Sequence, residues 1–392
     1  MKDNTTKLLG LEEAIVKNVY EDEESCHIEL ELPKKVHRCP CCGHETDKVH
    51  DYRIQIIKDL PVSGRHTYLH LRKRRYVCPD CGKRFYEENH FLPRYYRVTN
   101  RMVAFIINRF RSAVSATDIA SENNISVSTA LRYFDLVHYQ CQHLPEVLSI
   151  DEFKGNAGGE KFQTILTDAA RKRIIDILPS RKSSELINYF LKYPLNERSN
   201  VKYVVMDMSS LFRGVVSLCF PKATIVADRY HVIRQAVWAM ENVRKDVQKS
   251  LSPKWRKFFK RSRYLLNKKP QNLTEEEKDK LRILLGISSK LEYAYELKNK
   301  FSNLMNAPDS DSGRKLIADW LLLAEDAGLR EFNACTNAIH NWSNEILASF
   351  DCCYSNGFTE GCNNKTKVLK RISFGVRNFS RFRNRILHCA AS

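Results

Sequence analysis

Two short cysteine motifs of the same spacing constrain this chain more than any other feature of its sequence. Cys39 and Cys42 lie in CPCCG, and Cys78 and Cys81 lie in CPDCG, with residues 43–77 between them. Each motif can offer two thiolates to one metal ion, and its glycine permits the tight turn that this requires. Because four thiolates complete a closed tetrahedron, the spacing predicts one structural zinc ion.

Residues 35–95 resemble a zinc ribbon, because the strand-like run HTYLHLRKRRYVC joins the two motifs. Two alternatives for the ligands stay open. Cys41 could replace Cys42 in register, although only Cys39 with Cys42 has the usual spacing, and His44 could substitute for a cysteine, although a surface histidine is the simpler interpretation. Thirteen cysteines, an odd number in a chain without a secretory pattern, indicate a reducing cytoplasm rather than disulfides.

The charge of the chain is strongly basic, with 64 Lys and Arg against 46 Asp and Glu and a net charge of +18. This excess predicts a polyanionic partner. Residues 1–34 form an acidic arm with nine acids and four bases, whereas residues 361–392 hold eight bases and no acid. Phe374, Phe379 and Phe382 lie between the arginines of that tail, a pattern typical of a nucleic-acid surface. Without an apolar run near the roughly 18 residues of a membrane helix, we expect no membrane span.

Residues 96–143 have helical patterning, with an apolar face over 99–110, a short helix in TDIASENN, a turn at 124–126 and a further helix in VSTALRYFDLVHY. The last two helices are typical of a helix-turn-helix, whose second helix can enter the major groove of DNA. Its polar residues Ser128, Thr129 and Arg132 are the expected DNA contacts. A helical hairpin inside a bundle gives a similar pattern, but the basic ribbon before it favours DNA binding.

Beyond residue 143 the patterning predicts an α/β domain. Apolar runs alternate with helical segments over residues 144–228, and only helical patterning follows over 229–350. Ser252-Pro253 predicts a helix start, and Thr274 with Glu277 predicts a capping box. Residues 351–392 hold a glycine-bearing turn and the basic helical tail.

Three acidic residues lie at positions where catalytic or metal-binding carboxylates are often found. Asp151 follows the apolar run VLSI and Asp207 follows YVVM, so both should lie at the C-terminal ends of buried strands. Glu360 lies on a predicted helix, with Lys367 two turns further on. Acids after strands are often only turn or cap residues. Three carboxylates without a Ser-His-Asp array nevertheless favour magnesium or manganese, and a pair of such ions can drive attack on a phosphodiester.

The two CPxCG motifs, the helix-turn-helix pattern and the segments SIDEF, VVMDMS, ADRYHV and SNGFTEGCNNKTKVLKRISFGVRNFSRFRNRIL together resemble the bacterial insertion-sequence transposases of the ISL-three family. The resemblance extends over nearly the whole chain. It implies a DDE triad on an RNase H-like core, with Asp151, Asp207 and Glu360 at the matching positions and an all-helical insertion before the third acid.

Asp228 and His231 match a motif of the same family, and Asp228 competes with Asp207 because it also follows a buried strand. We prefer Asp207, whose spacing from Asp151 suits adjacent central strands. Asp168 fits a hairpin turn, and Glu152 is expected to be structural.

We therefore expect a multidomain DDE transposase, whose zinc ribbon and helix-turn-helix bind terminal inverted repeats and whose core cleaves DNA and joins it to a target. Lys367, Lys370 and Arg371 are the expected phosphate contacts. The resemblance also implies a homo-oligomer, at least a dimer on paired ends, in the bacterial cytoplasm at the nucleoid. Two alternatives remain, namely a DNA-binding regulator with an inactive core and a structure-selective nuclease of RNase H-like fold.

Overall fold

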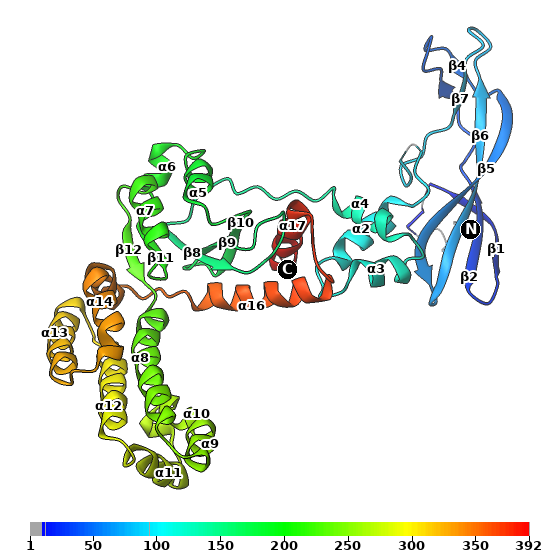
Figure 1. The fold of residues 1–392 in the computed structure, drawn as a ribbon. Coiled ribbons are helices and arrows are strands. Elements are labelled where there is room, and N and C mark those ends of the chain that lie inside the picture. The colour runs from blue at the N-terminus through cyan, green and yellow to red at the C-terminus, as the bar shows by residue number, and fades with distance from the viewer. Residues whose placement is uncertain (1–9, 12, 94, 392) are drawn as a thin grey trace. The chain divides into compact units, whose positions relative to one another are not determined.

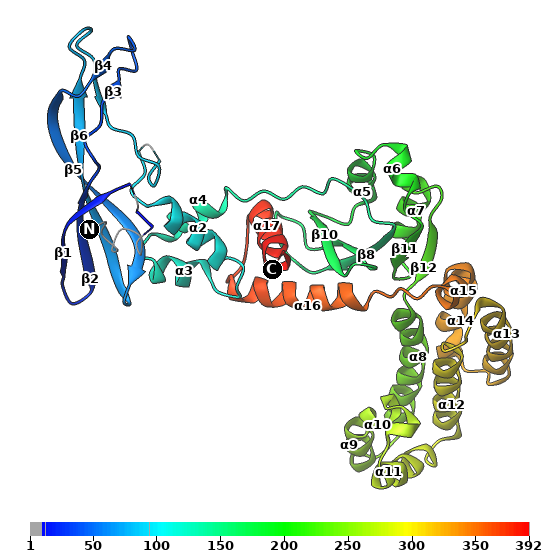
Figure 2. The same ribbon diagram turned by 180° about the vertical axis from the view of Figure 1, so that it is seen from behind.

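The structure, a computed structural model, describes residues 10, 11, 13–93 and 95–391. The chain forms two compact units, each made of segments that are distant in sequence (Figures 1 and 2). Unit 1 comprises the described residues up to 139 together with 368–376 and 380–391, and unit 2 comprises 140–367 and 377–379. No helix among the described residues is long and apolar enough to span a membrane.

Unit 1 contains a five-stranded sheet in the order β1-β2-β6-β5, with β7 paired to β6. Strands β2 and β6 run parallel, and the other pairs are antiparallel. The predicted acidic arm thus contributes two strands to this sheet, while its residues 1–9 and 12 lie outside the described residues. The strands are β1 (Ile15–Glu21), β2 (Ser25–Glu31), β5 (Val49–Val62), β6 (Arg65–Val77) and β7 (Arg84–Tyr86).

The long β5–β6 hairpin turns at Ser63 and Gly64, whose φ angles of 51° and 79° are those of a two-residue turn that matches the twist of the strands. Ile57, Leu69 and Leu71 point to one face and form a core with residues of β2. The alternation of a strand puts Ile54 and Ile56 on the opposite face, where both are exposed.

Three short helices of unit 1 follow the sheet: α2 (Asn100–Arg109), α3 (Ala116–Glu122) and α4 (Val127–Phe134). Thr99, Ser115 and Ser126 cap their N-termini by accepting backbone hydrogen bonds. Helix α4 ends earlier than the sequence predicts. The carbonyl groups of Val137 and Tyr139 accept hydrogen bonds from Asn384 and Arg383 instead of continuing the helix.

The last helix, α17 (Phe379–Ala390), packs against these helices within unit 1. Phe382 is 1% exposed, and the Arg385 guanidinium donates to the carbonyl oxygens of Ser112 and Val114. Arg381 forms a bidentate ion pair with Asp135. The prediction that this basic, aromatic tail is a nucleic-acid surface is therefore wrong for Phe382 and Arg385, because both side chains are buried in unit 1.

Unit 2 contains a mixed sheet in the order β10-β9-β8-β11-β12, as the α/β patterning predicts. Strands β8, β9 and β10 are antiparallel neighbours, whereas β11 is parallel to both β8 and β12. The elements up to this point are β8 (Val147–Phe153), β9 (Gln163–Asp168), β10 (Arg173–Leu178), α5 (Ser183–Phe190), α6 (Leu195–Ser199), β11 (Tyr203–Met206), α7 (Ser210–Cys219) and β12 (Thr224–Ala227).

A helical region follows β12, as predicted. The capping box at Thr274 and Glu277 and the helix start at Pro253 are both confirmed. One hydrophobic core runs from strand residues such as Leu148 to helical residues such as Trp320, so this region and the sheet share a core. Its elements are α8 (Arg229–Lys249), α9 (Pro253–Arg261), α10 (Arg263–Asn267), η1 (Pro270–Asn272), α11 (Glu275–Leu285), α12 (Ser289–Leu304), α13 (Ser310–Asp326), η2 (Arg330–Phe332), α14 (Asn333–Asn341) and α15 (Ser343–Asp351). Helix α16 (Gly357–Ile372) follows, with its residues up to 367 in unit 2 and the rest in unit 1.

Candidate metal centres and nucleic-acid surface

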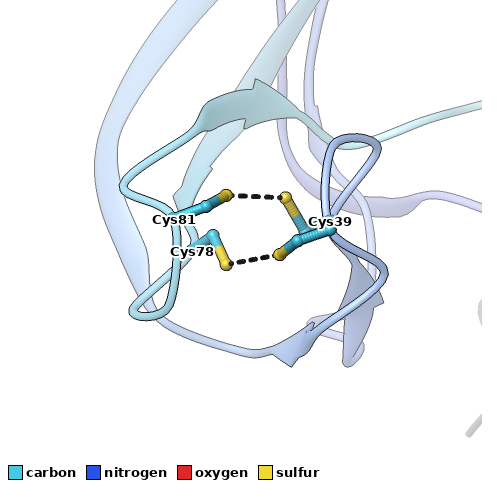
Figure 3. A group of neighbouring side chains, drawn as sticks. Cys39, Cys78 and Cys81 are labelled. Carbon is cyan, nitrogen blue, oxygen red and sulfur yellow. Dashed lines mark hydrogen bonds between the residues drawn. The ribbon is translucent and has the colours of Figure 1, made fainter.

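The four predicted zinc ligands come together in unit 1. The Sγ atoms of Cys39 and Cys81 lie 3.5 Å apart, as do those of Cys42 and Cys78 (Figure 3). A regular ZnS₄ tetrahedron with bonds of about 2.3 Å has sulfur atoms about 3.8 Å apart, whereas a disulfide needs about 2.05 Å. All four sulfurs lie within 4.8 Å of one another, and neither Cys41 nor His44 belongs to the group. The four cysteines that the spacing predicts as ligands are therefore the ones that the structure brings together.

The backbone shapes each cysteine motif into the same turn. The amide of Gly43 donates to the Cys39 carbonyl, and the amide of Gly82 donates to the Cys78 carbonyl. Both glycines have φ above +70°, a conformation that favours glycine over other residues. Burial opposes ionisation of Cys39, but the backbone amides of Cys42 and Cys41 donate to its sulfur and lower the pKa to about 6. Strands β3 (His37–Arg38) and β4 (Glu45–Thr46) flank the first motif.

Asp151 and Asp207 occupy corresponding positions of two adjacent parallel strands in unit 2. The last pair of the β8–β11 register is Ile150 with Met206, and each acid is the next residue of its chain. Asp151 is 7% exposed, and burial raises its pKa to about 7, with further contributions from the negative charges of Asp207 and Glu360. The sequence predicts this proximity of the two acids, but β8 continues two residues beyond Asp151.

Asp207 is also held in an environment that opposes its charge. Burial raises its pKa, and its Oδ1 is buried without a hydrogen-bond partner among the described residues. An unpaired buried carboxylate oxygen is costly, so native sites usually supply a donor, a water or a cation.

Glu360, Asp228 and His231 form the second part of this cluster. One ligand atom of each lies within 4.8 Å of the others, which is close enough for a shared metal ion. His231 Nδ1 lies 2.8 Å from Asp228 Oδ2, and this hydrogen bond raises the pKa of the imidazole. The sequence ranks Asp228 below Asp207, whereas the geometry brings Asp228 next to Glu360.

Small polar residues hold the start of α16 on the sheet. The Thr359 hydroxyl lies 3.0 Å from that of Ser149 and 2.7 Å from that of Thr167, and Ser149 also donates to Asn356. One turn further on, Asn363 Nδ2 donates to Asp151 Oδ2 over 2.8 Å. These contacts determine where Glu360 lies. Sequence reasoning missed them, although Ser149 and Thr167 are visible as hydroxyl residues inside apolar runs.

The other acids near the cluster have structural partners, as the sequence predicts. Glu152 forms an ion pair with Arg181 over 2.7 Å. Asp168 lies at the end of β9, where it accepts the Arg171 amide of the β9–β10 turn. Both carboxylates therefore stabilise local structure.

The predicted phosphate contacts lie along the second half of α16. Lys367 is exposed and its Nζ donates to Asn364 over 3.3 Å, while Lys370 and Arg371 lie in the last turn. This face of the helix is positively charged.

The predicted DNA contacts on α4 differ in their surroundings. The Ser126 hydroxyl lies 2.9 Å from the hydroxyls of both Ser128 and Thr129, so these side chains take part in the cap of the helix. Arg132 is exposed beside the ring of Tyr133.

Comparison with known proteins places the chain among transposases. A family model described as a transposase, for the ISL-three group, matches residues 148–386, and a model described as the zinc finger of the transposases IS204, IS1001, IS1096 and IS1165 matches residues 35–81. The transposase for insertion sequence element IS1001 of Bordetella parapertussis is 26% identical over 370 residues, covering 90% of this chain and 88% of that protein. The transposase for insertion sequence element IS1557 of Mycobacterium tuberculosis is 24% identical over 241 residues, which cover 56% of this chain and 54% of that protein.

The class of this protein is an insertion-sequence transposase with an N-terminal zinc ribbon. The four-cysteine cluster lies in the range that the zinc-finger model matches, and the acids lie in the range that the transposase model matches. The chain belongs to the ISL-three family of these transposases, whose model covers more than half of it.

Proposed function

We propose that this protein is a DDE transposase that binds the terminal inverted repeats of its insertion sequence, cleaves the DNA strands there and joins the ends to a target. The observation that carries the proposal is the placement of Asp151 and Asp207 at equivalent points of adjacent parallel strands, with Glu360 near enough for its charge to raise the pKa of Asp151 and within 4.8 Å of Asp228 and His231. Buried acids whose pKa is raised by burial and by neighbouring negative charge, as that of Asp151 is, are typical of functional sites.

The residues present fit a pair of divalent cations. The cluster offers carboxylate oxygens, which magnesium and manganese prefer, and the unpartnered Oδ1 of Asp207 is a ready ligand. Asp151, Asp207 and Glu360 would hold the ions, with Asp228 as the competing second acid and His231 beside it. When bound, such ions supply the charge that activates a water or a 3′-hydroxyl and stabilises the departing oxygen of the phosphodiester.

Other side chains of the same unit position these acids. Asn363 donates to Oδ2 of Asp151 and the Glu152 amide donates to its Oδ1, and the Ser149 and Thr167 hydroxyls hold the helix that carries Glu360. Lys367 lies two turns beyond Glu360, where its ammonium group can pair with a phosphate of the DNA. The protein therefore contributes position and charge without a covalent intermediate.

The proposal includes an RNase H-like catalytic core and a helix-turn-helix, as the family resemblance of the sequence implies. A sheet of three antiparallel strands followed by two parallel ones supports an RNase H-like core over residues 144–228 and 351–392, although 368–376 and 380–391 of the latter range belong to unit 1. Residues 229–350 would be its helical insertion. Capped helices α3 and α4, joined at Asn124 with a φ of 47°, support a helix-turn-helix over residues 96–143. The zinc ribbon of 35–95 precedes it, and the active form would be at least a dimer on paired ends.

The test measures cleavage and strand transfer on a duplex that carries the terminal repeat flanking the gene, with magnesium. Asp151→Asn, Asp207→Asn and Glu360→Gln should each lower both activities by at least about a hundredfold, and pairs of them should lose little more, because such residues act as a unit. Glu152→Gln is the matched control, since it removes an acid next to Asp151 that an arginine already neutralises.

The outcomes separate the alternatives. Cleavage without joining would favour the structure-selective nuclease, and specific binding without any metal-dependent cleavage would favour the regulator. If Asp228→Asn abolished cleavage while Asp207→Asn retained it, Asp228 would be the second acid of the triad.

A further inference from the structure

Unit 1 has a groove of about 680 Å³ between the hairpin β5–β6, residues 95–98 and the first turns of α4. Its walls carry the rings of Tyr68, Tyr95 and Tyr96 and the cationic side chains of Lys58, Arg97 and Arg132. None of the described residues that line it is acidic. The groove is thus aromatic and positively charged, a combination that suits a nucleic-acid strand.

The nearest acid in the sequence is turned away from the groove. Asp59 follows Lys58 on β5, but it is 2% exposed and accepts hydrogen bonds from the Thr99 hydroxyl at 2.6 Å and from Arg101 Nε at 2.8 Å. Its charge is neutralised there, so the cations of the groove are left to attract an anion.

The two sides of the groove are held together by the turn before α4. The Asn124 side chain donates to the Tyr68 hydroxyl over 2.8 Å, and Lys58 donates to the Asn124 carbonyl. Because the sheet and the turn are joined by side chains of the same unit, the groove is preformed.

Tyr95 is held in an uncommon conformation at the rim. Its φ is 69°, in the left-handed region that residues other than glycine adopt when their surroundings require it, and its side chain is 85% exposed. A large ring presented to solvent in this way is typical of a surface that makes a contact.

We propose that this groove holds one sugar-phosphate strand of the DNA whose major groove α4 enters, with Arg97 and Arg132 on its phosphates and the Tyr95 ring packed on a nucleotide. The inference rests on the proposed function of α4. A helix in the major groove lies between two phosphate backbones, so the backbone on the side of α4 that faces the sheet must pass into this groove. The exposed face of the hairpin then becomes part of the DNA-binding surface.

The test measures binding of the full-length protein to a labelled terminal-repeat duplex and to a random duplex, by fluorescence anisotropy over a range of salt concentrations. Arg97→Ala should weaken binding to both, and should lower the slope of log affinity against log salt by about 0.9, the value for one lost phosphate contact. Tyr95→Ala should weaken binding and leave the slope unchanged, while Tyr95→Phe should bind like the wild type.

Arg53→Ala is the matched control, because Arg53 is exposed on the same strand β5 but does not line the groove. It should keep both affinity and slope. Equal losses in Arg97→Ala and Arg53→Ala, or wild-type binding by Arg97→Ala, would overturn the assignment of the groove. If the wild type itself bound neither duplex, the proposed function would fail instead.

A photo-crosslinker at position 95 tests the same inference without removing a contact. Tyr95→benzoylphenylalanine should crosslink to the bound duplex. Crosslinks only to a second copy of the chain, or none to DNA that is demonstrably bound, would show that another occupant or no occupant fills the groove.

Discussion

At the residue scale, the acid cluster of unit 2 combines burial with like charge. Asp151 and Asp207 lie on neighbouring strands, and burial raises the pKa of both. Carboxylates placed in this way oppose folding unless a cation or a donor compensates them. The cost is reduced by Asn363, which donates to Asp151, but Asp207 Oδ1 has no such donor among the described residues.

Metal binding should therefore stabilise this unit measurably. Magnesium should raise the melting temperature of the wild type, whereas Asp207→Asn should melt higher than the wild type in a chelator and gain little from magnesium, because the repulsion is already relieved. Differential scanning fluorimetry with and without magnesium makes the comparison. An equal magnesium shift in Asp207→Asn would contradict the site.

The cysteine cluster gives a second prediction at this scale. Purified protein should hold about one zinc ion per chain, and Cys78→Ser should lose it, because three thiolates leave the tetrahedron open. Metal analysis by mass spectrometry checks the stoichiometry. Cys41→Ser is the control, since Cys41 lies in the same motif outside the ligand group. Full zinc content in a Cys39→Ser, Cys78→Ser double variant would rule out the assignment.

At the scale of the element, helix α12 contains a lysine where the pattern of the helix calls for an apolar residue. Lys298 is 3% exposed, its Nζ lies 4.7 Å from the ring of Tyr295, and burial lowers its pKa to about 8. The unfolded chain keeps this proton up to about pH 10.5, the ordinary value, so the folded state binds fewer protons between these two pH values.

The free energy of unfolding should consequently rise with pH from about 8 to 10.5 in the wild type, and this rise should disappear in Lys298→Met. At pH 7 the variant should be more stable by about 2 kcal/mol, because no buried ammonium remains to be desolvated. Urea unfolding at several pH values measures both effects. Lys300→Met, an exposed change on the same helix, should alter neither.

At the scale of the whole molecule, the two ends of the described chain meet in unit 1. Helix α17 places Phe382 in the core of the helical part and supplies Arg385 to the carbonyls of Ser112 and Val114. His388 lies 2.9 Å from the Ile107 carbonyl. The helices α2 to α4 therefore share their core with α17.

A fragment of residues 1–143 should accordingly expose the apolar surface that α17 covers and should unfold or aggregate at lower temperature than unit 1 in the full chain. Adding a peptide of residues 377–392 should restore its melting temperature and its DNA binding. Circular dichroism and anisotropy measure the two properties. A peptide with Phe382→Ala should restore less, and a fragment that is stable alone would contradict the role of α17.

The sequence alone determines the features that depend on local spacing. The grouping of four cysteines follows from two short motifs, because each motif forms its turn within a few residues. The helix start at Ser252-Pro253 and the capping box of Thr274 and Glu277 follow in the same way, since both depend only on the first turn of the helix. Asp151 and Asp207 could be placed together because parallel strands align their equivalent ends.

Only the tertiary structure decides contacts between segments that are distant in the chain. The hydroxyls of Ser149 and Thr167 under α16, the approach of Asp228 to Glu360, and the burial of Arg385 each join residues more than a hundred positions apart. The identity of a charged or polar residue does not show whether its side chain is exposed to water or bonded to another part of the protein. Which of the two it meets depends on packing that brings the partner to it, and spacing along the chain does not specify that packing.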